Sequence, residues 1–457
     1  MDVTIVGGGI TGLSAAYELA QRRVPFTLIE SAPRLGGLIL TERVDGFTIE
    51  AGPDSMLVQK PAALQLCDQL GLGPRLISTT PPRTAYILKR GRLYALPSPS
   101  ILGIPLTWRG VVRYELLPLH SRVRLALETV APRARDSADE SIAAFFRRRF
   151  GRAAVDLIAD PLLGGIHAGS IDKLSMRSLF PRLVEAERRG SVVLGFRRRH
   201  SSSATEGPFK SLSSGMSEIV SAIEQRLPAG SVRLATEARA LEHEGESWRV
   251  ISSEAVFTSR AVILCVPAYV AGQLLRSLDT HAAALCEGVP YVSTVSVALA
   301  WPRGAVAHDL QGSGFVVARS QNALRITAST WVSSKWSGRA PSGFALIRAF
   351  LGSAADPSAV DLADNELIDT ARKEVASILG IGGPPVLARV YRWRNAGAQH
   401  VVGHLTRVAA IEERLAQYPG LFVAGSGFRS TGIPDCVADG RAAAAAAAAT
   451  LRSVDDQ

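Results

Sequence analysis

Two short, mostly apolar runs flank a glycine-rich loop and a helical pattern at the start of the chain. Residues 3–6 (VTIV) and 26–29 (FTLI) have the composition of strands that are buried on both faces. Between them, residues 10–21 place apolar side chains at the spacing of an amphipathic helix. The pattern therefore predicts a strand, a tight turn, a helix and a second parallel strand.

The end of the chain has the same kind of pattern in residues 421–450. A short apolar run, bounded by Gly420 and Gly425, predicts another buried strand. After a polar loop, Pro434 suits a first helical turn because its missing N–H would be unpaired there, and Asp435 favours the positive end of a helix. Eight consecutive alanines then continue the helix with high propensity and little bulk, which permits close packing.

The middle of the chain supplies further pieces of the same type of sheet. Residues 209–227 predict a helix after a glycine turn, residues 230–253 a strand meander, and residues 260–268 one more buried strand. Together with the two ends, these segments predict an α/β, Rossmann-like sheet built from separate parts of the chain.

The predicted domain organisation has three parts. The discontinuous cofactor-binding domain comprises residues 1–85, 206–269 and 386–457, a mostly helical insert comprises residues 86–205, and a mixed-sheet, substrate-binding domain comprises residues 270–385. We expect one mobile loop, at about residues 200–208, where serine, glycine and proline gather. The chain is therefore α/β in its cofactor domain and α+β as a whole.

Composition agrees with a folded protein of two or three domains. The chain has 457 residues, of which 47% are hydrophobic and 20% charged. Its four cysteines are far apart and form no CxxC pair, so we expect neither a metal site nor a disulfide framework. This cysteine usage fits a reduced, cytoplasmic setting.

The sequence contains no segment that we expect to cross a membrane. The N-terminus has no basic region before its first apolar run, unlike a secretory signal peptide. The longest apolar stretch, residues 261–275, contains Pro267 and is shorter than the roughly 18 residues that span a bilayer. We expect a soluble protein, with peripheral membrane contact left open.

The net charge of +10 has two explanations. One is a genome composition that favours arginine, and the other is a surface that attracts nucleic acid, anionic lipid or an acidic substrate. Arginines cluster in residues 145–152 and 195–200, but without interleaved aromatic residues and without a nucleic-acid-binding motif. We therefore expect no nucleic-acid partner.

The first loop has the spacing of a dinucleotide-binding turn. Gly7, Gly9 and Gly12 form a GxGxxG sequence that follows a strand and opens a helix. Their expected roles are, in order, the tight turn, close approach of the backbone to a pyrophosphate, and close packing of helix on strand. The helix N-terminus would offer free N–H groups to the phosphates, and Glu30 at the end of the second strand would bind ribose hydroxyls.

The next segment favours FAD over a nicotinamide cofactor. Arg34, Gly36 and Gly37 form an RxGG sequence, and residues 52–55 (GPDS) follow. This order resembles the second fingerprint of two-domain flavoprotein oxidases, in which RxGG lies behind the FAD pyrophosphate. In such a fold the last strand joins the N-terminal sheet, and the start of the last helix points at the flavin ring.

Nearly the whole chain resembles the protoporphyrinogen/coproporphyrinogen oxidase family, the oxygen-dependent flavoenzymes of haem synthesis within the amine-oxidase-like flavoprotein superfamily. The stretches GGIHAGSIDKLS (164–175) and GIPDC (432–436) are more specific for this family than the glycine loop. The resemblance implies FAD, a tetrapyrrole substrate and molecular oxygen. Hand-over of the product to another haem-pathway enzyme remains open.

The resemblance also implies which residues form the site. It places Trp393 near the flavin, and Val232 would contact the adenine end through its backbone. The expected cofactor-binding residues are Gly7, Gly8, Gly9, Ile10, Thr11, Gly12, Glu30, Ser31, Arg34, Gly36, Gly37, Leu38, Gly52, Pro53, Asp54, Ser55, Val232, Trp393, Gly425, Gly432, Ile433 and Pro434. Gly165 and His167 are the expected substrate-side residues, and no side chain is assigned as catalytic. Packed core residues are the competing interpretation for His167, Trp393 and Val232.

Within the family, the sequence is more similar to the coproporphyrinogen branch. Ile101 stands where the protoporphyrinogen type tends to have an arginine that holds a propionate. Two departures concern the substrate face: His167 replaces a usual tyrosine or phenylalanine, and residues 392–404 lack the usual proline and tyrosine. The predicted reaction removes six electrons from coproporphyrinogen III in three flavin cycles and releases hydrogen peroxide.

Three alternatives remain at this point. The first is oxidation of protoporphyrinogen IX. The second is an amine oxidase or carotenoid desaturase, although Ser426 follows Gly425 where many amine oxidases have an acid. The third is a porphyrin or flavin carrier without turnover.

Overall fold

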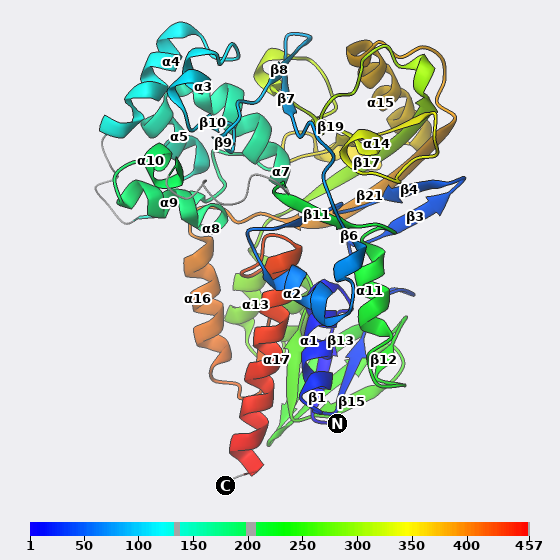
Figure 1. Ribbon diagram of the computed structural model, residues 1–457. Coiled ribbons are helices and arrows are strands. Elements are labelled where there is room, and N and C mark those ends of the chain that lie inside the picture. The colour runs from blue at the N-terminus through cyan, green and yellow to red at the C-terminus, as the bar shows by residue number, and fades with distance from the viewer. Residues whose placement is uncertain (132–137, 198–206, 456–457) are drawn as a thin grey trace.

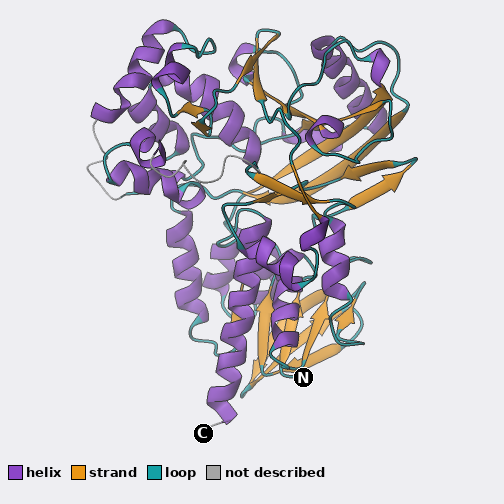
Figure 2. Ribbon diagram, viewed as in Figure 1, coloured by secondary structure: helices purple, strands orange, loops and turns teal. Residues whose placement is uncertain are grey.

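The computed structural model describes residues 1–131, 138–197 and 207–455. Figures 1 and 2 show two halves: one contains both chain termini, and the other contains a long mixed sheet beside a group of helices. The loop expected at residues 200–208 lies almost entirely outside the described residues. Among the described residues, no helix has both the length and the apolar character needed to span a bilayer.

A five-stranded parallel sheet forms the centre of the half that holds the termini. Its order is β12-β2-β1-β16-β22, and every neighbouring pair is parallel. The strands are β1 (Val3–Val6), β2 (Phe26–Ile29), β12 (Val232–Arg233), β16 (Ala261–Leu264) and β22 (Leu421–Val423). The predicted α/β sheet is confirmed, including the entry of the last strand beside a strand from the middle of the chain.

The first and last helices pack against each other on this sheet. Helix α1 (Ile10–Gln21) follows the glycine loop, and α17 (Ile433–Asp455) follows the loop after β22 (Figure 1). One face of the alanine run is buried and the other is exposed. The buried residues are Ala443, Ala444, Ala447 and Ala448, and the exposed residues are Ala442, Ala446 and Ala449. Small side chains therefore allow the two ends of the chain to approach closely.

The remaining elements of this half cover the sheet edges. Strands β13 (Ala238–Glu244), β14 (Ser247–Ser252) and β15 (Val256–Ser259) form the predicted antiparallel meander. Helices α2 (Ala62–Gln69) and α11 (Ser217–Glu224) contribute to the same apolar core as α1 and α17. Helices α12 (Ala268–Leu275), α13 (Thr280–Glu287) and α16 (His404–Leu415) pack in a second core with β16 and β22.

A seven-stranded mixed sheet forms the other half, in the order β21-β17-β20-β19-β18-β7-β8. Its strands are β7 (Ala85–Lys89), β8 (Arg92–Ala95), β17 (Tyr291–Pro302), β18 (Gly314–Val317), β19 (Ala328–Trp331), β20 (Phe344–Leu351) and β21 (Leu387–Ala398). Helix α15 (Asp364–Leu379) shares an apolar core with β17 and β20. Two short sheets, which include β3 (Thr41–Val44), β4 (Phe47–Glu50), β5 (Met56–Leu57), β6 (Leu76–Ser78) and β11 (Phe209–Leu212), lie between the halves.

The sheet membership differs from the expected domain boundaries in three places. Strands β7 and β8 belong to the mixed sheet and not to the helical insert, because β7 pairs in parallel with β18. Strand β21 also belongs there, because it pairs with β17 along nearly its whole length. Conversely, α12 and α13 complete the core beneath the parallel sheet. Hydrogen bonding between distant strands decides these memberships, and short apolar runs do not reveal their partners.

The helical insert has its own apolar core and a buried ion-pair cluster. Its main helices are α3 (Trp108–Val112), α4 (Leu119–Ala126), α5 (Ile142–Phe150), α8 (Met176–Leu179), α9 (Pro181–Arg188) and α10 (Val192–Arg197). Arg149 is fully buried and bonds Glu128, while Arg148 bonds Glu140 and Glu187. Two arginines of the first predicted cluster therefore hold the insert together, and they are not free to attract anions.

The α1–α17 contact gives a test of the fold. A Cβ on Gly440 would lie 2.1 Å from the Thr11 carbonyl oxygen, so Gly440→Ala forces the helices apart. Helix propensity alone would favour alanine by about 1 kcal/mol, but the overlap with backbone should cost more, about 1–3 kcal/mol net. Urea unfolding should show lower stability for Gly440→Ala. The exposed control Ala442→Leu should change little, and equal stability of Gly440→Ala and the unchanged protein would contradict this packing.

Candidate active site

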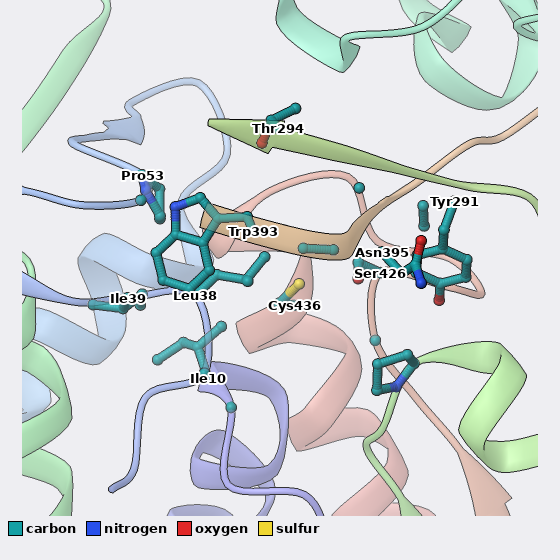
Figure 3. Close-up of a pocket in the computed structure, with 18 of the residues that line it drawn as sticks. Ile10, Leu38, Ile39, Pro53, Tyr291, Thr294, Trp393, Asn395, Ser426 and Cys436 are labelled. Carbon is teal, nitrogen blue, oxygen red and sulfur yellow. The ribbon is translucent and has the colours of Figure 1, made fainter. Parts of the chain in front are cut away.

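A cavity of about 1310 Å³ lies where the two halves of the molecule meet. Segments from both ends of the chain, the mixed sheet and the helical insert all contribute to its wall. Figure 3 shows Pro53, Leu38 and Trp393 toward one side of the cavity and Tyr291, Asn395 and Ser426 toward the other. A single ligand usually occupies roughly 300–1,000 Å³, so this cavity has room for more than one.

Most of the residues predicted from the sequence line this cavity. They are Gly7, Gly9, Ile10, Thr11, Glu30, Ser31, Gly36, Gly37, Leu38, Gly52, Pro53, Asp54, Ser55, Gly165, His167, Trp393, Gly425, Gly432 and Ile433. Five others lie outside the lining: Gly8, Gly12, Arg34, Val232 and Pro434. The structure thus brings together segments that are hundreds of residues apart.

The glycine loop has the shape that a dinucleotide pyrophosphate needs. Gly7 has φ +108°, which favours glycine, and a Cβ on Gly12 would lie 1.9 Å from the Gly7 carbonyl oxygen. In contrast, a Cβ on Gly9 would meet no protein atom within 4 Å. The space in front of Gly9 belongs to the cavity, at the N-terminus of α1, so this cradle fits an FAD pyrophosphate.

Glu30 and the RxGG turn shape the same end of the cavity. The Glu30 carboxylate accepts hydrogen bonds from the backbone N–H groups of Gly8 (2.6 Å) and Ala32 (2.8 Å) and lines the cavity. The Arg34 guanidinium donates to the carbonyl oxygens of Leu35 and Gly37, at 3.1 and 2.7 Å. Arg34 therefore holds the turn in place from behind, while Gly36 and Gly37 face the cavity.

The GPDS loop is fixed by two cations, Arg348 of β20 and Lys335 at the end of the short helix α14 (Val332–Lys335). Lys335 lies 2.8 Å from the Asp54 carboxylate, and Arg348 donates to the Gly52 carbonyl oxygen at 2.8 Å. Burial alone would raise the pKa of Asp54, but Lys335 and Arg348 hold that pKa well below its usual range. The carboxylate is therefore charged at all working pH values, and it links the cofactor half to the mixed sheet.

Trp393 and the C-terminal loop form the middle of the cavity. The Trp393 indole N–H donates to the Ala51 carbonyl oxygen at 2.9 Å, which fixes the ring beside the GPDS loop (Figure 3). Across the cavity, the backbone N–H of Gly425 donates to the Asp439 carboxylate of α17 at 2.7 Å. The start of α17 thereby presents Gly432 and Ile433 to the cavity, where the flavin ring is expected.

The expected substrate residues lie at the insert side. A π-helix (Val155–Gly164) leads directly into the short helix α7 (Gly165–His167). The side chain of Ile166 is 64% exposed and lines the cavity, and a Cβ on Gly165 would meet no protein atom. Burial, together with nearby His400 and Lys60, lowers the pKa of His167 to about 4, so His167 is neutral near pH 7.

Two further histidines support the C-terminal loop. The rings of His400 and His404 stack with centroids 3.8 Å apart. Their Nε2 atoms are 2.9 and 2.7 Å from the carbonyl oxygens of Ser426 and Phe428. Both are almost completely buried. This pair connects α16 to the loop that carries Gly425, and only His400 also lines the cavity.

Sequence reasoning missed several lining residues: Tyr291, Thr294, Arg348 and Asn395 of the mixed sheet, and Lys335 of the short helix between β19 and β20. Arg348 could have been identified from the sequence. It is the one charged residue within the apolar run 344–351, and a buried charge of this kind needs hydrogen-bonding or charged partners. Ile101, expected at a propionate position, packs against the core of the insert and does not line the cavity. The sequence position of Ile101 does not show which residues pack around its side chain.

A parallel nucleotide-binding sheet, a glycine cradle at its first helix and a second ligand space under a mixed sheet define a flavoprotein of the two-domain oxidase type. A comparison with known families agrees. The model of the flavin containing amine oxidoreductases matches residues 10–448. The chain belongs to this family, and the predictions of a flavin cofactor and of this fold are confirmed.

Individual members of the family that are similar to this chain include porphyrinogen oxidases. Coproporphyrinogen III oxidase of Bacillus subtilis (strain 168) is 36% identical, with 96% of each chain covered. Protoporphyrinogen oxidase 1 of Spinacia oleracea chloroplasts is 27% identical, with 96% of this chain and 82% of the relative covered. The crystal structure of a putative protoporphyrinogen oxidase from Exiguobacterium sp. 255-15 superimposes with a TM-score of 0.87, at 31% identity over 99% of both chains.

The cradle leads to a direct test of cofactor binding. In Gly9→Val the new side chain would enter the cavity without meeting protein, and the φ of −68° and ψ of 176° at Gly9 suit valine. We expect a folded protein with an unchanged far-UV circular dichroism spectrum but less than about a tenth of the normal FAD content, because the side chain occupies the place of the pyrophosphate.

The matched control is Gly304→Val. Gly304 also has free space around a Cβ, but it lies outside the cavity lining. This variant should keep its FAD. A Gly9→Val protein that purifies with one FAD per chain would contradict the assignment of the cradle.

Proposed function

We propose that this chain is an FAD-dependent oxidase that converts coproporphyrinogen III to coproporphyrin III in haem synthesis. The observation that carries the proposal is the cavity of about 1310 Å³, in which a dinucleotide cradle opens into a second space under the mixed sheet. Similarity to coproporphyrinogen III oxidases over almost the whole chain supports the choice of substrate. The alignments cover 96% and 89% of the lengths of those two relatives.

The reaction balances as coproporphyrinogen III plus three O₂ giving coproporphyrin III plus three H₂O₂. FAD held at the glycine cradle would supply two-electron redox chemistry with oxygen as the final acceptor, so three rounds would be needed. The protein supplies orientation and exclusion of water. Apolar side chains at the cavity, such as Ile166 and Phe350, would cover the faces of the macrocycle.

The propionates of the substrate would meet cations at the cavity edge. Arg394 lines the cavity and pairs with Asp361, but 58% of its side chain is exposed, so it can turn toward a bound anion. Lys335 and Arg348 are already engaged by Asp54 and the GPDS loop. Arg394 is therefore the better candidate for a propionate contact.

Protoporphyrinogen IX, with two vinyl groups in place of two propionates, is the alternative substrate. An amine oxidase is less well supported, because Ser426 follows Gly425 and is not acidic. A carrier without turnover would bind porphyrin and consume no oxygen. Measuring porphyrin fluorescence and peroxide together after addition of porphyrinogen separates these alternatives.

The substrate preference gives the test of the proposal. Coproporphyrinogen III should have a kcat/KM at least about tenfold above that of protoporphyrinogen IX, since each added charge-assisted contact contributes about 1–3 kcal/mol. With a net charge of +10 on the protein, added salt should also reduce kcat/KM more steeply for the more anionic substrate. Both substrates are measured in the same detergent and salt.

Arg394→Met is the variant for this test, because it keeps an apolar stem and removes the charge. The variant should have a smaller ratio of kcat/KM for coproporphyrinogen III to kcat/KM for protoporphyrinogen IX, and its FAD content should be unchanged. Equal or reversed kcat/KM values in the unchanged protein would assign the chain to protoporphyrinogen IX and leave the flavin oxidase chemistry in place.

We further propose that the protein is cytoplasmic and touches a membrane surface through the outer end of the helical insert. Large apolar side chains are exposed on α3, on α4 and on the following turn: Trp108, Val112, Leu119, Val123, Leu127 and Val130, each at least 50% exposed. Arg109 and Arg113 are exposed beside them. This face lies at the opposite end of the molecule from the C-terminus (Figure 1), and apolar side chains flanked by arginine suit anionic lipid.

Vesicle sedimentation tests the membrane contact. The unchanged protein should sediment with phosphatidylglycerol vesicles at low salt, and Leu119→Glu with Val123→Glu should remain in the supernatant. Val256→Glu, at an exposed apolar position on β15, is the control and should sediment normally. Equal sedimentation of all three proteins, or of none, would refute the contact.

Direct transfer of the product is a related proposal. Coproporphyrin III is a flat, mostly apolar ring, and release into water would expose that apolar area. Transfer to the next haem-pathway enzyme avoids this exposure. Direct transfer predicts that coproporphyrin III moves from this protein to that enzyme faster than it moves from this protein to lipid vesicles added as a trap.

A further inference from the structure

The six-electron reaction also releases protons from pyrrole nitrogens, and the residues discussed so far do not accept them. When a two-electron acceptor takes a hydride from a meso carbon, the adjoining pyrrole ring becomes cationic and its N–H becomes acidic. Each round thus removes one hydride and one proton, and the proton needs a nearby acceptor. The following inference rests on the proposed function and concerns that acceptor.

Other titratable groups that line the cavity can be compared with His167; among them, the Glu237 carboxylate lies 3.7 Å from the Arg239 guanidinium. Glu30 is bonded to the backbone at the glycine-loop end, and Asp54 is engaged by Lys335 and by the indole of Trp336. Both ring nitrogens of His400 have partners, Ser178 and Ser426. Burial raises the pKa values of Cys265, Tyr291 and Cys436, so these groups keep their own protons.

His167 is different from these groups. Its backbone carbonyl accepts a hydrogen bond from Gln399 at 2.9 Å, and its ring meets Phe180 edge-on, with centroids 5.9 Å apart. Within the described residues, neither ring nitrogen has a hydrogen-bonding partner, although the residue lines the cavity. A polar ring that is held in place by its backbone, with both nitrogens unpaired, is arranged to meet a ligand.

The local backbone explains why this ring stays at the cavity wall. A π-helix of ten residues, which is rare and is often found at functional sites, precedes α7. Ala168 follows with a φ of +48°, and its carbonyl oxygen accepts from the backbone N–H of Ala354, in the turn after β20, at 2.8 Å. Strain of this kind persists only where the surroundings enforce it, and here contacts on both sides fix α7.

We infer that His167 accepts a hydrogen bond from a pyrrole N–H of the bound porphyrinogen and takes that proton as the hydride leaves the adjacent meso carbon. The neighbouring Ile166 covers the apolar part of the macrocycle. The hydride and its two electrons go to the flavin, and the proton goes from pyrrole nitrogen to imidazole nitrogen and then to water. The imidazole is neutral before each round, because its pKa is about 4, and that low value favours rapid return of the proton to solvent.

Chemical rescue tests this role. His167→Ala should keep its FAD and bind coproporphyrin III with a Kd within about threefold of normal. In anaerobic rapid mixing with porphyrinogen, bleaching of its flavin should be at least about tenfold slower. Added imidazole should restore the rate far more than pyrazole or 1,2,4-triazole, because the three rings have similar size and imidazole is much the strongest base.

Ile166→Ala is the matched control on the same helix. It should weaken coproporphyrin III binding through loss of apolar contact, and no added base should restore its rate. Rescue of His167→Ala that does not depend on basicity, or bleaching within threefold of normal, would overturn the inference.

A second measurement does not depend on turnover. With ¹⁵N-labelled histidine, the ring signal that disappears in His167→Gln should shift when coproporphyrin III is added to the unchanged protein. An unmoved signal, while porphyrin fluorescence reports binding, would also overturn the inference. If the unchanged protein oxidises no porphyrinogen at all, the proposed function fails; if it does and the variants behave normally, only the role of His167 fails.

Discussion

The close packing of the first helix against the last determines where the cavity forms. Gly440 leaves no room for a side chain above the Thr11 carbonyl oxygen, and the buried alanines of α17 keep the same short separation along α1. Because both helices start at the carboxyl ends of parallel strands, this contact brings the glycine loop and the residues around Gly432 to one edge of the sheet. The cofactor site is thus completed only when the last residues of the chain are in place.

A second set of contacts couples this half to the mixed sheet. Arg348 of that sheet and Lys335 of the adjoining α14 reach the GPDS loop, and Trp393 bonds the Ala51 carbonyl oxygen. These interactions set the distance between the cofactor cradle and the space under the mixed sheet. They also engage Lys335 and Arg348, two cations that line the cavity, so recognition of substrate anions is left to exposed side chains such as Arg394. Shape and apolar area would then hold the macrocycle, while charge at the edge selects among substrates.

The sequence predicted the parallel sheet, the glycine cradle and the C-terminal helix, because each depends on local spacing or on residues with special backbone preferences. It did not predict that β7, β8 and β21 share one sheet, since pairing with distant strands has no local signature. Residues such as Tyr291 and Thr294 line the cavity only because long strands cross it. Likewise Ile101 and Val232 are not among the residues that line the cavity, although the family resemblance associated their positions with ligands. Motifs that depend on local residue spacing could be predicted from the sequence, but the pairing of strands that are distant in the chain could not.

The central claim is that one cavity holds FAD at the glycine cradle and the porphyrinogen ring beside α7. A crystal structure of the protein with FAD and coproporphyrin III measures this most directly. The account predicts the pyrophosphate within hydrogen-bonding distance of the backbone at Gly9, the flavin ring near Trp393, and the macrocycle between α7 and the mixed sheet, with a pyrrole nitrogen facing His167. A macrocycle bound outside the cavity, or an FAD whose pyrophosphate lies away from Gly9, would contradict it.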